Sequence, residues 1–135
     1  MRGALTACLM VLAASACLVA RPPRQPAALA TTGAVRHVVV FRLKPGASPT
    51  QIRELTEAFS ALQRKIPGII AFEHGVNNSP EGRNMGFTHV YLLTFASAAA
   101  RDEYLPHPDH KAFGELLGRL GIVDGVFVVD YTPAP

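Results

Sequence analysis

Three segments of this sequence are apolar at consecutive positions, and this feature limits the folds that the chain can adopt. They are HVVVF (37–41), VYLLTF (90–95) and VFVV (126–129). A strand that is covered on one side only alternates apolar and polar residues, because successive side chains point to opposite faces. A sheet built from these segments therefore has two apolar faces, and both faces need cover.

Helices are predicted in three other segments, two of them from apolar periodicity and the short third from Ser97 as its cap and Pro106 as its end. In the longest, apolar residues recur at spacings of three and four and form one stripe. Ser48 and Pro49 stand before it as the N-cap and the first helical residue, and Pro67 with Gly68 ends it. The predicted helices are 49–65, 98–105 and 108–120, and the predicted strands are 35–44, 68–77, 87–95 and 125–133.

The order of these elements predicts an α+β fold of the ferredoxin-like βαββαβ type. Such a fold has an antiparallel four-stranded sheet with its helices on one face. A domain of about 100 residues has no second layer to cover the other face. We therefore expect a homodimer in which two sheets pack face to face, a dimeric α+β barrel, and the layer between the sheets is where we expect a cavity for a small apolar ligand.

The first 30 residues have the layout of an export signal. Arg2 precedes an apolar and small-residue run that ends at Arg21, and small residues suitable for cleavage end at Ala16 and at Ala30. The segment AASAC also resembles a lipoprotein signal, in which Cys17 would be lipidated and become the first mature residue. Soluble export, lipidation and an uncleaved anchor all remain open.

We therefore expect a periplasmic or extracellular protein, or one held at the membrane by a lipid. Residues 1–30 are assigned to the signal and the start of a Pro- and Ala-rich tether, 31–34 to the rest of the tether, and 35–133 to the folded domain. Membrane contact is expected only through the signal or the lipid.

Charge and cysteine content exclude several classes of function for the folded part. Of the 13 Lys and Arg residues, Arg2, Arg21 and Arg24 precede residue 31, whereas all 10 Asp and Glu residues follow it. The remaining chain has no net charge, so its composition gives no reason to expect nucleic acid binding. Both cysteines, Cys8 and Cys17, lie in the leader, which leaves the domain without a disulfide, a Cys nucleophile or a zinc–thiolate site.

Four stretches with a specific combined spacing resemble a known family. They are RHVVVFRLKPG, IPGIIAFEHGVNNSPEGRNMGFTHVYLLTF, RDEYLPHPDHKAF and FVVDYTP. Together they resemble the stress-responsive A/B barrel domain (Dabb) family over nearly all of 35–133. The resemblance implies a dimeric α+β barrel, and for most members of the family no reaction is established.

One plant branch of the family implies more about the candidate residues. It is a polyketide cyclase that closes a linear tetraketide by aldol condensation without metal or cofactor. Its base histidine and assisting tyrosine match His110 and Tyr104, and histidines near two of its strand starts match His37 and His89. Pro106 departs from its pattern and its pocket aromatics are not clearly matched, so its substrate does not carry over.

The residues themselves give His110 and Tyr104 a possible chemistry. If Pro108 opens a helix, His110 lies in the first turn, where the helix dipole disfavours the imidazolium and leaves a nitrogen free to accept a proton. Tyr104 could then donate a hydrogen bond to a developing enolate. The alternatives are a ligand contact without catalysis, and a structural role in which His110 bonds a backbone group and Tyr104 packs in the core.

Three further residues are candidate ligand contacts. Period-two counting places His37 on one face of its strand, and His89 and Tyr91 together on one face of another. If these faces line the cavity, we expect the two imidazoles at one end of it. The alternative is that they are half-solvated strand-end residues that bond to neighbouring loops.

We expect no metal and no cofactor. His107 is confined between Pro106 and Pro108, outside the helix that carries His110, so a helical ligand pair is not assured, and no HExxH motif is present. Nucleotide-binding and nucleophile-elbow motifs are missing from the sequence as well. Three functions stay open: a ligand-binding stress-response domain, a cofactor-free cyclase or isomerase with His110 as base, and a structural oligomer whose cavity is filled by side chains.

Overall fold

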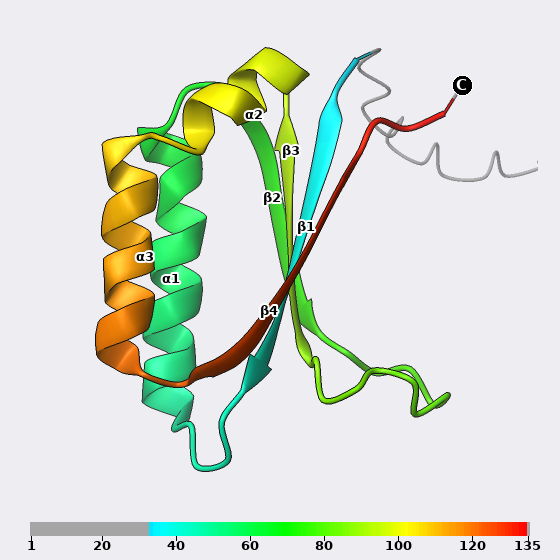
Figure 1. The fold of residues 1–135 in the computed structure, drawn as a ribbon, viewed down its shortest axis with the longest axis vertical. Helices are drawn as coiled ribbons and strands as arrows, with labels where there is room; N and C mark the ends of the chain where they lie inside the picture. The colour runs from blue at the N-terminus through cyan, green and yellow to red at the C-terminus, as the bar shows by residue number, and fades with distance from the viewer. Residues whose placement is uncertain (1–32, 135) are drawn as a thin grey trace, which may run out of the picture.

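The computed structural model describes residues 33–134. Its elements, shown in Figure 1, are β1 (Val35–Leu43), α1 (Pro49–Lys65), β2 (Ile69–Val76), β3 (His89–Phe95), α2 (Ala98–Tyr104), α3 (Pro108–Leu120) and β4 (Val123–Tyr131). The predicted leader, most of the tether and the lipidation candidate Cys17 lie outside the described residues.

The four strands form one antiparallel sheet in the order β2-β3-β1-β4. Helices α1 and α3 lie side by side against one face of it, and the other face has no helix over it (Figure 1). The predicted ferredoxin-like α+β fold is therefore confirmed. Within 33–134, no helix is long and apolar enough to span a bilayer.

Local sequence signals account for most of the boundaries. Ser48 caps α1 in a capping box with Gln51, and Ser97 caps α2 by accepting a hydrogen bond from the backbone N–H of Ala100. Strand β4 begins at Val123, two residues before the predicted start at 125. Gly121 ends α3 in a left-handed conformation with φ of 62°, which lets the chain enter the sheet at once.

The core lies between the sheet and the helices. Apolar side chains from every other position of β1 and β3 face α1 and α3 there, because alternate residues of a strand share a face. Its largest buried members are Phe41, Phe59, Tyr91, Phe95 and Tyr104. Phe59 of α1 stacks on Phe113 of α3 with ring centroids 4.5 Å apart, which joins the two helices over the sheet.

The face of the sheet away from the helices is also apolar, as the sequence predicts. Val38 lies between Leu92 and Val129, and Val40 lies between Val90 and Phe127 in the neighbouring strands. Phe127 and Val129 are 52% and 42% exposed. This open face is therefore a continuous apolar surface across three strands.

Candidate functional site

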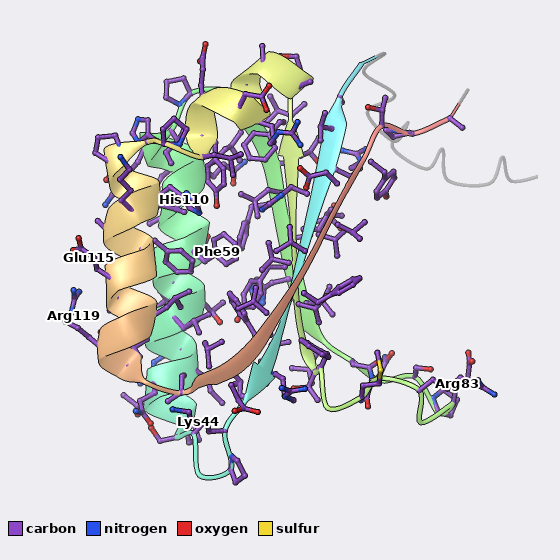
Figure 2. All side chains as sticks on the ribbon, in the orientation of Figure 1. Lys44, Phe59, Arg83, His110, Glu115 and Arg119 are labelled. Atoms are coloured by element: carbon purple, nitrogen blue, oxygen red, sulfur yellow. The ribbon has the colours of Figure 1, made fainter. Side chains whose placement is uncertain are left out.

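A cavity of about 230 Å³ lies between the sheet and the helices of the single chain. We expected a cavity between two sheets, and this one is on the opposite, helix-covered side of the sheet. In Figure 2, His110 and Phe59 point into the space between helices and sheet, whereas Glu115 and Arg119 point away from it. The cavity is lined by His37, Val39, Phe41, Phe59, Tyr104, Leu105, His110, Phe113, Gly114, Leu117, Val126 and Val128.

Tyr104, the last residue of α2, provides a buried hydroxyl at one end of this cavity. The residue is 1% exposed, and its ring packs against His37 and Phe95 at centroid distances of 5.7 and 5.0 Å. Among residues 33–134 its hydroxyl has no hydrogen-bond partner. Burial, helped by the negative charge of Asp130, raises the pKa of Tyr104 well above its usual range. The group therefore stays protonated and can donate a hydrogen bond to a ligand.

His110 lies over the ring of Tyr104, and one of its nitrogens is already hydrogen-bonded. Its Nδ1 lies 3.0 Å from the carbonyl oxygen of Leu105, and a carbonyl oxygen only accepts, so Nδ1 carries the hydrogen. In the neutral ring the lone pair is then on Nε2. The ring lies over Tyr104 with centroids 4.1 Å apart and planes inclined by 33°. The backbone bond and the cavity contact, which the sequence offered as alternatives, occur together.

His37 is held by Asp130, which also binds Arg101, and the sequence analysis did not predict these contacts. The residue is 6% exposed, and its Nδ1 lies 2.5 Å from a carboxylate oxygen of Asp130 in β4. Arg101 of α2 donates a hydrogen bond to the other oxygen of Asp130. Burial alone would raise the pKa of Asp130, but the hydrogen bonds and charges of His37 and Arg101 outweigh it and lower that pKa.

Arg101 reaches from α2 to this carboxylate and is not part of a fully solvated helix face. Its side chain is 24% exposed and spans from Asp102 to Asp130. One signal in the sequence could have indicated Asp130, because it is the one acidic residue that directly follows the apolar run VFVV. Its partner could not have been found without the register that pairs it with His37.

His89 and Tyr91 lie elsewhere. Strands β1 and β3 are antiparallel, so His37 stands opposite Leu93 while His89 stands opposite Phe41, at the other end of the same face. The expectation that the two imidazoles share one end is therefore wrong. His89 bonds to Thr88, and burial lowers its pKa.

The hydroxyl of Tyr91 is already bonded within the core. Thr56 donates its single hydroxyl hydrogen to the carbonyl of Ile52 at 2.9 Å, so Tyr91 must be the donor in its 2.8 Å bond to Thr56. Burial raises the pKa of Tyr91. Neither Tyr91 nor His89 lines the cavity.

His107 has a structural role at the helix junction. It is the N-cap of α3, and its Nδ1 accepts a hydrogen bond from the backbone N–H of Asp109 at 3.2 Å. Within the described part of the chain, no group of three or more His, Cys, Asp or Glu side chains is arranged to hold a metal ion.

The cavity thus has a polar end and an apolar end. Tyr104, His110 and His37 lie at one end, and Phe41 lies four residues further along β1, about 13 Å away at the usual rise of a strand. Near the polar end, the Tyr104 hydroxyl can donate a hydrogen bond and Nε2 of His110 can accept a hydrogen or a proton. The arrangement suits an elongated apolar molecule with an oxygen group at one end.

Comparison with known proteins places the chain in a family. A family model described as the Stress responsive A/B Barrel Domain matches residues 35–133. The stress-response A/B barrel domain-containing protein HS1 of Arabidopsis thaliana is 39% identical over 101 residues, which cover 75% of this chain and 91% of that protein. Olivetolic acid cyclase of Cannabis sativa is 27% identical over 100 residues, which cover 74% and 97% of the two chains.

Solved structures of the same fold agree with this placement. The hydroxynitrile lyase of Passiflora edulis superimposes with a TM-score of 0.67 at 28% identity, over 74% of this chain and 93% of that one. A protein from Jannaschia that is described as dimeric and ferredoxin-like has a TM-score of 0.62 at 30% identity. The match covers 73% of this chain and 98% of that one. The fold, the family model and the identity to HS1 agree, and the chain belongs to the stress responsive A/B barrel domain family.

Proposed function

We propose that this stress-response A/B barrel protein is exported, forms a homodimer, and binds a small, largely apolar molecule that carries one oxygen group. The observation that carries the binding proposal is the hydroxyl of Tyr104, which is buried at one end of an apolar cavity and has no partner in residues 33–134. A buried hydroxyl without a hydrogen bond is unfavourable, and a ligand oxygen at that point would satisfy it. The proposal of export rests on the signal-like pattern of residues 1–30.

Two observations support the homodimer. The open face of the sheet exposes Phe127 and Val129 beside the apolar positions of β1 and β3, and a surface of this kind favours burial against a second copy. Several solved structures of the same fold are described as dimeric. The cavity lies on the opposite side of the sheet, so each protomer would hold its own ligand.

A phenol is a suitable probe for the cavity. Its oxygen can accept a hydrogen bond from Tyr104, its hydroxyl can donate to Nε2 of His110, and its ring can pack against the cavity-facing sides of Phe59 and Phe113. Isothermal titration of the intact protein with 4-propylphenol is expected to show binding. The Y104F variant should bind about fivefold more weakly, since a net hydrogen bond contributes about 1 kcal/mol.

The matched control is Y91F, which removes a hydroxyl from a core tyrosine that does not line the cavity. Its affinity for 4-propylphenol should equal that of the wild type. Failure of the wild type to bind, or equal affinities for Y104F and Y91F, would contradict the proposal. Native mass spectrometry of the protein from its own cell would also report a retained ligand, the dimer and any lipid at Cys17.

A second candidate function, cofactor-free proton transfer, is favoured by the tautomer of His110. Its Nδ1–H bonds to Leu105, which leaves the lone pair on Nε2, in a ring that lies over Tyr104 and lines the same cavity. In this scheme Nε2 takes a proton from the carbon next to a carbonyl group. The C–H electrons form the C=C bond of an enolate, and Tyr104 donates a hydrogen bond to the oxygen that receives the carbonyl π electrons. The relatives named as a cyclase and a lyase support this candidate.

Hydrogen–deuterium exchange provides a test that needs no knowledge of the natural substrate. Phenylacetone in D₂O is expected to lose its α-protons faster with the wild-type protein, as followed by proton NMR. The H110N variant should abolish that acceleration because it removes Nε2. The control H107N removes a neighbouring imidazole outside the cavity and keeps a good N-cap residue. Equal exchange rates for H110N and H107N would exclude His110 as the base.

A further inference from the structure

Gly114 occupies a position in α3 where the backbone and the packing do not require a glycine. Its φ is not left-handed, in contrast to Gly121 at the end of the helix with φ of 62°. A Cβ at Gly114 would meet no atom within 4 Å, whereas one at Gly68 would lie 2.6 Å from Cβ of Ala100. Glycine in a helix interior is a poor helix former, so its presence here calls for another reason.

The cavity provides that reason. Gly114 follows His110 by one helical turn and lines the cavity between His110 and Leu117. It is exposed, so it lies on the open side, where the valines of β4 that line the cavity, Val126 and Val128, are 53% and 49% exposed. The space that a side chain at 114 would occupy is therefore part of the opening between α3 and β4.

We propose that Gly114 determines the ligand specificity of the cavity by leaving room for a planar ring next to Tyr104 and His110. The aromatic walls formed by Phe59 and Phe113 favour a flat ring in that space over a narrow chain. This inference rests on the proposed binding function and adds the residue that sets the width of the ligand.

Gly118 gives a matched control within the same helix. It follows Gly114 by one turn, would also accept a Cβ without meeting an atom within 4 Å, and does not line the cavity. The variants G114L and G118L should both raise the melting temperature, because leucine is a much better helix former than glycine. A shared rise would show that both variants fold and that the two positions tolerate the side chain.

The test compares a broad and a narrow probe, 2-naphthol and 4-methylphenol, by isothermal titration. Each methylene-sized group excluded from an apolar site lowers affinity by about fourfold, so excluding two lowers it about 15-fold. G114L should therefore weaken the binding of 2-naphthol by about 15-fold and that of 4-methylphenol by less than threefold. G118L should change neither affinity. If G114L does not fold, G114A replaces it, with an expected two- to fourfold loss for 2-naphthol.

The outcomes separate this inference from the binding function. If the wild type binds 2-naphthol, Y104F weakens that binding, and the Gly114 and Gly118 variants behave alike, the role of Gly114 is refuted while the binding function stands. If the wild type binds neither probe, or if Y104F binds as the wild type does, both proposals fail. Selective loss of 2-naphthol in the Gly114 variant alone supports the role of Gly114.

Discussion

Replacing Tyr104 by Phe is expected to make the ligand-free protein more stable. The ring of Tyr104 keeps its contacts with His37, Phe95 and His110 in the variant, so only the hydroxyl is lost. That hydroxyl is buried and has no partner in residues 33–134. Burial of an unsatisfied polar group costs about 1–3 kcal/mol, so we expect the free energy of unfolding to rise by about 1 kcal/mol or more.

The opposite result is expected for Y91F, so the two variants should change the free energy of unfolding in opposite directions. The Tyr91 hydroxyl is equally buried but donates to Thr56, which in turn donates to the Ile52 carbonyl. Removal of that donor should lower the free energy of unfolding by about 1 kcal/mol. In a domain of about 100 residues, 1 kcal/mol corresponds to a shift of about 4–8 °C in melting temperature.

The assay is urea and thermal unfolding of dialysed protein, with all variants at one protomer concentration because formation of the proposed dimer would contribute to apparent stability. Y104F should melt above the wild type, and Y91F below it. If Y104F is destabilised as much as Y91F, the Tyr104 hydroxyl has a partner in the native protein. The main support for a ligand at that point would then be lost.

Three further predictions concern the charge pair, the helix junction and the open face. Because the pKa of Asp130 is lowered, its stabilising effect is present above about pH 4 and is lost as the pH falls through the folded-state pKa. The free energy of unfolding of D130N, measured with urea between pH 2 and 7, should therefore fall less than that of the wild type as the pH is lowered. An equal fall in both proteins would contradict the interaction of Asp130 with His37 and Arg101. H107A should lower the melting temperature through loss of about 1 kcal/mol of N-cap stabilisation, whereas H107N should not, and equal melting temperatures would exclude the cap. If the proposed dimer forms through the open face, F127D places a charge there and should halve the mass found by light scattering, whereas the control E115A, on the outer side of α3, should keep the wild-type mass.

The sequence predicted the fold well because the signals for its elements are local. Ser48, Pro49 and the apolar stripe of α1 lie within one short segment, and so do Pro108 and the residues of α3. Which side chains meet in the site depends on the register between strands, and local sequence patterns do not predict that register. Period-two counting gives the face of His37 and His89 but not their positions along it, and antiparallel pairing separates them.

The same limit explains why Asp130 was missed. It lies 93 residues after His37, and only the pairing of β4 with β1 places its carboxylate 2.5 Å from the imidazole. The cavity on the helix-covered side of the sheet was not predicted, for a related reason. Apolar residues on both faces of a strand show that both faces are covered, but they do not show on which side the packing leaves space.

The segment from Tyr104 to His110 joins a structural role to the proposed chemical one. Pro106 and Pro108 separate α2 from α3, and the break leaves the carbonyl of Leu105 without a helical partner. His110 satisfies that carbonyl through Nδ1–H, and the same bond places the lone pair on Nε2. The hydrogen bond that holds the junction together therefore also prepares the ring to accept a proton.

Two substitutions at His110 should separate these roles. H110A removes both nitrogens and should lower the free energy of unfolding by about 0.5 kcal/mol, since the Leu105 carbonyl loses a partly exposed hydrogen bond. In H110N the amide nitrogen can take the place of Nδ1 as donor to Leu105, so its stability should match the wild type. Both variants lack Nε2, so both should fail to accelerate deuterium exchange into phenylacetone. If H110N retained that acceleration, the proton acceptor would have to be another group, and His110 would have only the structural role at the helix junction.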